Sequence, residues 1–180
     1  MTQHWVFGYG SLMWRPGFDY VRKCPALVRG YHRSLCVYSH VHRGTPDRPG
    51  LVLALDRGGS CHGTAFEIAT THWDDTVAYL RAREQVTKVY IERQIFLTLS
   101  QPPYRVQALT YVVDRRHIQY AGVLSHIIQA QHVCGAEGVS GRNTEYVLNT
   151  LAHLRELNIR DATLEKLAVQ LRLQAALNSS

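Results

Sequence analysis

The stretch WVFGYGSL, residues 5–12, predicts a first β-strand that ends in a glycine-rich turn. Aromatic and β-branched residues fill its first half, as is typical of strands. Two glycines flank Tyr9, where missing side chains let backbone N–H groups turn toward a bound anion or carbonyl oxygen. The alternative is a glycine bulge in a core strand. A dinucleotide-binding motif is excluded, because a third glycine is missing and Pro16-Gly17 interrupts where the phosphate-binding helix would begin.

Strand-like segments continue to residue 113, and helical segments follow. The further predicted strands are Ser34–Ser39, Leu51–Leu55, Gly63–Ala69, Ile95–Leu99 and Val106–Val113. Arg57-Gly58-Gly59 predicts a hairpin between the second and third of these, and Pro102-Pro103 separates the last two. Helices are predicted from Thr71 to about Gln85, from about Tyr120 to Gly135, from Asn143 through Leu157, and from Asp161, where Leu164, Leu167 and Leu171 form one stripe.

Strands around one helix, followed by a helical C-terminal third, describe an α+β fold. Six short, antiparallel-looking strands can close into a small barrel. The length of 180 residues and the lack of a linker predict one domain over residues 1–180.

Composition narrows the class of protein. With 46% apolar and 19% charged residues, global disorder is excluded. The longest strictly apolar run, Leu51–Leu55, is far shorter than the ~20 residues of a membrane span. The first residues lack a basic segment, so we expect no signal peptide. The 4 cysteines are far apart and form no CxxC pair, which indicates reduced core thiols in a cytoplasmic protein.

The formal net charge of +6 is unevenly distributed. Residues 1–60 contain 8 basic and 3 acidic side chains, a balance of +5, which indicates an anionic partner for this third of the chain. The basic residues, mostly arginine, are scattered rather than clustered with aromatic residues. This distribution disfavours nucleic-acid binding.

Glu84 is the strongest candidate for acid/base chemistry. At ~100° per residue, Glu84 falls on the same helical stripe as Trp73, Val77 and Leu80, which is otherwise apolar. Burial and the helix C-terminus would both raise the pKa of this carboxyl group, which suits a general acid or base near neutral pH. The alternative is that the last turn frays and Glu84 reaches solvent or pairs with Arg81 or Arg83.

Other motifs give weaker signals. The loop Arg43-Gly44-Thr45-Pro46 offers an arginine that could hold a carboxylate, or it is a surface turn. His40 and His42 have no obvious third ligand, and His126 and His132 face different ways on a helix, so we expect no metal site. A GxSxG motif is absent from the sequence, and its cysteines have no recognisable activating context, which leaves nucleophilic catalysis unsupported.

Four segments together resemble a known family. They are Trp5–Leu12 with Pro16-Gly17-Phe18; Arg43–Pro46 through Pro49-Gly50; Tyr79–Glu84; and Gly141–Tyr146 continuing to Leu154–Leu157. In their order and spacing, over roughly residues 5–170, the chain resembles the ChaC-like γ-glutamylcyclotransferases, the glutathione-specific branch of the cyclotransferase superfamily. The resemblance implies a small, mostly antiparallel β-barrel with surrounding helices.

The resemblance also implies a reaction and a site. The α-amine of a γ-glutamyl unit attacks its own γ-carbonyl carbon, releasing 5-oxoproline and, from glutathione, cysteinylglycine. Glu84 corresponds to the acid/base glutamate, and no metal or cofactor is needed. The substrate-binding residues implied are Val6, Phe7, Gly8, Tyr9, Gly10, Ser11 and Leu12, with Arg43 as a carboxylate holder and Tyr146 as a pocket wall or hydrogen-bond donor. For Tyr146 the alternative is a core tyrosine.

The sequence departs from the family pattern just after Glu84. Many relatives have glycine and tyrosine soon after this glutamate, whereas this chain has Gln85-Val86-Thr87-Lys88-Val89-Tyr90, with no glycine. The turn that follows the helix is therefore expected to differ.

Two other functions compete with glutathione cleavage. One is a cyclotransferase for other γ-glutamyl amines or amino acids. The other is a non-catalytic module that uses the basic first third to hold an anionic metabolite or nucleic acid. The sequence leaves the oligomeric state open.

Overall fold

The structure, a computed structural model, describes residues 3–177 and divides into two compact units. The barrel unit comprises the residues up to Ser34 together with Ala54–Arg116. The helical unit comprises Leu35–Leu53 together with the residues from His117 onward. The prediction of a single domain stays a prediction.

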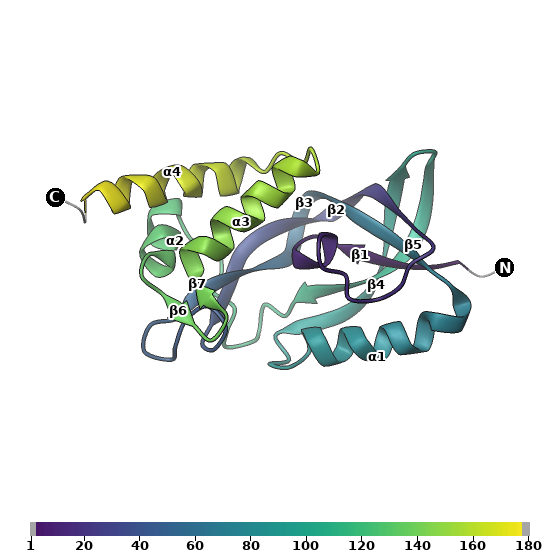
Figure 1. The fold of residues 1–180 in the computed structure, drawn as a ribbon, viewed down its shortest axis with the longest axis horizontal. Helices are drawn as coiled ribbons and strands as arrows, with labels where there is room; N and C mark the ends of the chain where they lie inside the picture. Colours follow the sequence, from purple (N-terminus) through teal and green to yellow (C-terminus); the bar gives the residue numbers. More distant parts are fainter. Residues whose placement is uncertain (1–2, 178–180) are drawn as a thin grey trace. The chain divides into compact units, whose positions relative to one another are not determined.

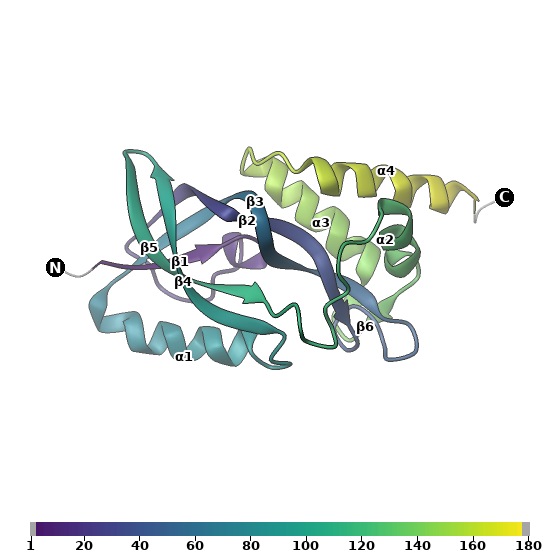
Figure 2. The same cartoon turned by 180° about the vertical axis from the view of Figure 1, so that it is seen from behind.

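A closed five-stranded barrel, in the order β1-β3-β2-β4-β5, forms the sheet (Figure 1 and Figure 2). Its strands are β1 (His4–Gly8), β2 (Arg22–Ser39), β3 (Gly50–Ile68), β4 (Tyr90–Ser100) and β5 (Pro103–Val113). β1 is antiparallel to β3 and parallel to β5, where Val6 pairs with Leu109. This barrel and the helical last third confirm the predicted α+β class.

Alternation along β1 divides its side chains between two clusters of core residues. Trp5 and Phe7 point into the barrel interior, where they pack with Leu55, Leu97 and other apolar residues. Val6 instead lies in the second cluster, against α1 (Trp73–Glu84). Because both faces of β1 are buried, the strand is a rigid base for the turn that follows it.

The predicted hairpin at Arg57-Gly58-Gly59 is wrong. β3 continues without reversal from Gly50 to Ile68. Gly58 and Gly59 adopt φ values of +98° and +69°, which only glycine adopts at little cost. The glycines therefore allow a local change of direction within one long barrel strand, where the sequence pattern indicates two short ones.

The helical unit contains three helices and one short hairpin among the described residues. They are α2 (His126–Val133), β6 (Glu137–Gly138), β7 (Gly141–Arg142), α3 (Asn143–Glu156) and α4 (Ala162–Leu177). α4 packs against α2 and α3 (Figure 1). Its predicted stripe is confirmed, since Leu164, Leu167 and Leu171 are buried, and the Asp161 carboxylate accepts a hydrogen bond from the Leu164 N–H at 3.0 Å.

One helix starts later than predicted. α2 begins at His126 and not near Tyr120, because the Ser125 hydroxyl caps it by accepting a hydrogen bond from the Ile128 N–H at 3.3 Å. The preceding residues pair with β2 instead, where Val37 forms an isolated bridge with Tyr120.

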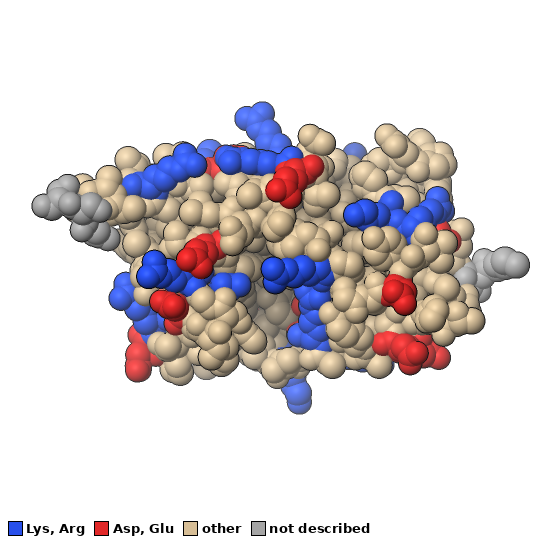
Figure 3. All heavy atoms as spheres, viewed as in Figure 1, with Lys and Arg blue, Asp and Glu red and all other residues tan. Residues whose placement is uncertain are grey.

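The cysteine thiols lie mostly in the core, as predicted. All 4 cysteines are free, and Cys24, Cys36 and Cys61 are buried, whereas Cys134 is partly exposed. On the face drawn in Figure 3, basic side chains are interspersed with acidic ones. Within residues 3–177, no helix has the length and apolar character needed to cross a membrane.

Candidate active site

The glycine-rich turn links β1 to a short 3₁₀ helix, η1 (Ser11–Met13). The Met13 N–H donates to the Gly10 carbonyl at 2.9 Å and closes this turn. A Cβ atom at Gly8 would lie 3.0 Å from Leu12 Cβ, so glycine allows the chain to fold back on itself. A Cβ atom at Gly10 would meet no atom within 4 Å, which leaves open space beside its α-carbon.

Two buried side chains fix the main chain of the turn from inside the barrel unit. The Arg33 guanidinium donates from Nε to the Tyr9 carbonyl at 2.6 Å and from Nη2 to the His62 carbonyl at 2.7 Å. The Thr110 hydroxyl donates to the Phe7 carbonyl at 3.0 Å. With these carbonyl groups held, the peptide planes of the turn have one orientation. No sequence pattern points to Arg33 and Thr110, because their partners are backbone atoms 24 and 103 residues away.

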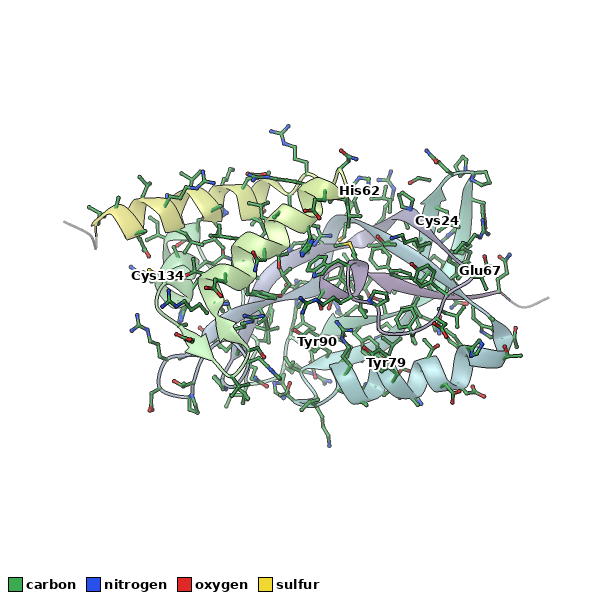
Figure 4. All side chains as sticks on the ribbon, viewed as in Figure 1. Cys24, His62, Glu67, Tyr79, Tyr90 and Cys134 are labelled. Carbon is green, nitrogen blue, oxygen red and sulfur yellow. The ribbon has the colours of Figure 1, made fainter. Side chains whose placement is uncertain are left out.

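α1 packs over the same end of the barrel unit through an apolar cluster. Leu80 is fully buried there, with Val6 of β1 and Leu109 of β5, and Trp73 and Val77 pack against them. The predicted apolar stripe of α1 is thereby confirmed. Tyr79 of α1 and Tyr90 of β4, both labelled in Figure 4, also pack against this cluster.

Glu84 is the last residue of α1 and is largely withdrawn from water. Its side chain is 19% exposed, and its Oε1 lies 3.3 Å from Nε of Arg83. Burial raises the pKa of the Glu84 carboxyl above its ordinary value, and the positive charge of Arg83 opposes the rise only in part. Burial and an arginine partner, which the sequence offered as alternatives, are both present.

Arg83 also connects Glu84 to the glycine-rich turn. Its Nη2 donates to the Ser11 hydroxyl at 2.9 Å, and its Nη1 donates to the Arg15 carbonyl at 2.8 Å. The structure therefore brings together two predicted site residues from distant parts of the chain, Ser11 and Glu84, through one guanidinium.

A second carboxylate lies on the neighbouring strand. Glu92 of β4 accepts two hydrogen bonds from Arg81, at 2.8 and 2.9 Å, and one from the Tyr111 hydroxyl at 3.1 Å. The Arg81 hydrogen bonds hold the pKa of Glu92 below its ordinary value. Burial, Glu92 and, to a smaller extent, Glu84 raise the pKa of Tyr111, so this phenol stays protonated.

The predicted residues Arg43 and Tyr146 belong to the helical unit, where they contact each other. The Arg43 guanidinium carbon lies 5.2 Å from the centre of the Tyr146 ring, a cation–π contact. The Tyr146 hydroxyl accepts a hydrogen bond from the Leu53 N–H at 3.1 Å. Both side chains are partly exposed.

Asn143 explains why this part of α3 lies against β3. Its buried amide donates to the Leu51 carbonyl at 2.8 Å and accepts from the Leu51 N–H at 2.7 Å. Asn143 thus pairs like a strand residue with β3. The prediction that it caps the helix is wrong, because the capping position is Arg142 and Asn143 is the first helical residue.

The other predicted binding residues differ in how their side chains are placed. Val6 and Phe7 are fully buried, and Tyr9 and Leu12 nearly so. The side chains of these four residues belong to the core, and the main chain of Val6 and Phe7 pairs with β3. Among residues 3–177, no three His, Cys, Asp or Glu side chains are grouped as metal ligands would be.

Comparison with known proteins gives matches along nearly the whole chain. The sequence matches the ChaC-like protein family over residues 4–174. It is 31% identical to a glutathione-specific γ-glutamylcyclotransferase of Escherichia coli, covering 97% of this chain and 75% of that protein. It is 35% identical to glutathione-specific γ-glutamylcyclotransferase 1 of Danio rerio, covering 84% and 79%. In fold it is similar to a glutathione-specific γ-glutamyl cyclotransferase from yeast, with a TM-score of 0.85, 21% identity and 96% of each chain covered.

Proposed function

The chain belongs to the ChaC-like family, and we propose that it is a γ-glutamylcyclotransferase that converts glutathione to 5-oxoproline and cysteinylglycine. The observation that carries this proposal is the extent of the similarity to the curated relatives. Proteins 31% and 35% identical to it, over 97% and 84% of its length, are named as glutathione-specific enzymes of this kind. The enzyme is a lyase, because the amide bond is cleaved without water.

Glu84 serves this reaction as the general acid and base. Its carboxylate removes a proton from the α-ammonium group of the γ-glutamyl unit, and the freed amine attacks the γ-carbonyl carbon. The C–N bond to cysteine then breaks as the protonated Glu84 returns a proton to the departing nitrogen, and the ring nitrogen loses its second proton to leave the lactam N–H. The raised pKa supports both roles, because the group holds its proton more readily than an exposed glutamate does.

The glycine-rich turn binds the γ-glutamyl unit. Backbone N–H groups near Gly10 and Ser11 stabilise the oxyanion that forms on the γ-carbonyl oxygen. The open space beside Gly10 supports this assignment, as do the hydrogen bonds that hold the Tyr9 and Phe7 carbonyls. Nucleophile and electrophile belong to one molecule, so orienting the folded substrate supplies much of the rate enhancement.

Arg43 and Tyr146 are proposed to contact the substrate through a carboxylate. The planar guanidinium of Arg43 presents paired N–H donors that suit a carboxylate. The Tyr146 ring, which the guanidinium contacts, limits the orientation of that group. The excess positive charge of residues 1–60 favours an anionic peptide substrate. We further propose one cytoplasmic domain that works without metal, cofactor or nucleic acid.

The proposal is tested by 5-oxoproline release from purified protein, with glutathione and γ-glutamyl-alanine as parallel substrates. We expect turnover of glutathione to exceed that of the alanine compound. Turnover of γ-glutamyl-alanine alone would assign the enzyme to other γ-glutamyl compounds. Absence of 5-oxoproline from both would favour the anion-binding module, whose binding would weaken steeply with salt if its ligand were a nucleic acid.

A further inference from the structure

Arg83 of α1 contacts both the glycine-rich turn and Glu84. Its Nη1 donates to the Arg15 carbonyl at 2.8 Å and to the Tyr79 hydroxyl at 3.0 Å, and its Nη2 donates to the Ser11 hydroxyl at 2.9 Å. Its Nε lies 3.3 Å from the Glu84 carboxylate. One planar guanidinium therefore contacts the glycine-rich turn, the segment after η1, and the acid/base candidate.

The surroundings of Arg83 hold its guanidinium group in place. Its side chain is only 25% exposed, and Tyr79 lies one turn earlier on α1. The Tyr79 hydroxyl in turn packs against Gly17, where a Cβ atom would lie 2.0 Å from the hydroxyl oxygen. Gly17 also has a φ of +74°. Only glycine allows the chain to pass so close, so the sequence element Pro16-Gly17 keeps Tyr79 and Arg83 aligned.

We propose that Arg83 is a positioning residue of the cyclotransferase reaction, which fixes the Glu84 carboxylate relative to Ser11 of the glycine-rich turn. This inference rests on the proposed function of Glu84. It goes beyond it because Arg83 acts through Glu84 and Ser11 and needs no contact with the substrate. Both the fork geometry and the positive charge of Arg83 contribute, and they can be separated by substitution.

The charge contribution concerns the proton affinity of Glu84. From α1, Arg83 lowers the pKa of Glu84 against the effect of burial. From β5, Tyr111 faces the same region as a neutral phenol that donates to Glu92, and Glu92 of β4 is in turn neutralised by Arg81. The Tyr79 and Tyr90 rings pack against the same cluster. Among the described groups of the barrel unit, Arg83 is therefore the cation that acts on Glu84.

The test compares Arg83→Met, Arg83→Lys and the control Arg81→Met, which removes the same charge from the same helix. The readout is kcat and kcat/KM for 5-oxoproline release from glutathione across the pH range, with folding checked by circular dichroism. In Arg83→Met we expect kcat/KM at neutral pH to fall about 10- to 100-fold, because the catalytic groups lose their alignment. The acidic limb of the profile should also move to higher pH. Arg83→Lys should restore the position of the limb but not the full kcat, since lysine supplies the charge without the fork.

Each outcome bears on a different statement. If wild-type protein releases no 5-oxoproline, the proposed function fails before Arg83 is tested. If wild type is active and Arg83→Met keeps its kcat and its acidic limb, the inference on Arg83 is wrong. If Arg83→Met does not fold, Arg83→Lys decides, and an unchanged kcat in that variant would overturn the role of the fork. Arg81→Met is expected to keep the wild-type pH profile. If its acidic limb shifts as far as that of Arg83→Met, the shift reflects the net charge of the protein and the inference on Arg83 is wrong.

Discussion

Glu84 and Glu92 both lie beside an arginine of α1, yet their pKa values are shifted in opposite directions. Glu92 receives two N–H groups of Arg81 and the Tyr111 hydroxyl, and its pKa is lowered. Glu84 has Arg83 at 3.3 Å, but the other donors of that guanidinium bind Ser11, the Arg15 carbonyl and Tyr79, and burial raises the pKa of Glu84. The difference lies in where the guanidinium donors point and in how much water reaches the carboxylate.

The two carboxylates differ in how readily they hold a proton. A carboxylate saturated with charge-assisted hydrogen bonds stays ionised and has little capacity to accept a proton. A half-satisfied, desolvated carboxylate takes up and releases a proton more readily near neutral pH. Glu84 is linked to the glycine-rich turn through Arg83, which fits the acid/base role proposed for it.

The largest expected effect is on activity, in Glu84→Gln. With general acid/base catalysis removed, kcat for 5-oxoproline release should fall about 10²- to 10⁴-fold. The matched variant Glu92→Gln should stay within a few-fold of wild type. Steady-state assays with glutathione, alongside circular dichroism, distinguish the two. Equal losses of kcat in both variants would contradict the assignment of Glu84 alone as the acid/base group.

The next effect is on the pH dependence of kcat/KM. Since burial raises the pKa of Glu84, the base form is lost sooner as pH falls, and the acidic limb should lie above the ~4.3 of an ordinary glutamate. Below the limb, kcat/KM should fall about tenfold per pH unit. The limb should be unchanged in Glu92→Gln. A limb at or below the ordinary value in wild type would exclude Glu84 as the titrating base.

A smaller effect is expected on stability, in Glu92→Gln. Because the folded pKa of Glu92 is lowered, its ionised form stabilises the fold above the unfolded value of ~4.3. That contribution disappears as pH falls through the folded pKa. Urea unfolding should therefore find the variant modestly less stable than wild type at pH 7, with the gap closing toward acidic pH. The effect is small because solvent screens this partly exposed pair. A gap that stays constant with pH would mean that the ionised pair contributes nothing.

The smallest effect is on the stability of Glu84→Gln, and its sign is opposite. Here the folded state binds the proton more tightly than the unfolded chain, so wild type loses stability as pH rises from ~4.3 through the folded pKa. Glutamine removes this loss. At pH 7 the inactive variant should therefore be as stable as wild type or slightly more stable. A clear drop in its urea midpoint would indicate that the Arg83 ion pair outweighs desolvation.

The sequence predicts local features of the site well where periodicity carries them. The stripe that places Glu84 on the buried side of α1 follows from helical spacing alone, as does the packing of Leu164, Leu167 and Leu171. The hairpin at Gly58-Gly59 could not be excluded from sequence, because positive φ serves a bend within a strand as well as a reversal.

Groups that act over long sequence separations escaped prediction. Arg33 binds the Tyr9 carbonyl of the turn, 24 residues away, and Asn143 pairs with Leu51, 92 residues away. Such partners leave no local pattern, since any residue supplies a backbone group. Arg83 was named only as a possible partner of Glu84. Its contacts with Ser11 and Arg15 depend on how α1 lies over the turn.

Of the two carboxylates, Glu84 is the one that we propose to transfer the proton. The most direct test of this assignment is an NMR titration of protein with ¹³C-labelled glutamate carboxyl groups, in which Glu84→Gln and Glu92→Gln assign the two resonances. We expect Glu84 to titrate above the ordinary glutamate range, at the pH of the acidic limb of kcat/KM, and Glu92 to titrate below that range. Coincident titrations, or Glu92 titrating above Glu84, would contradict the assignment.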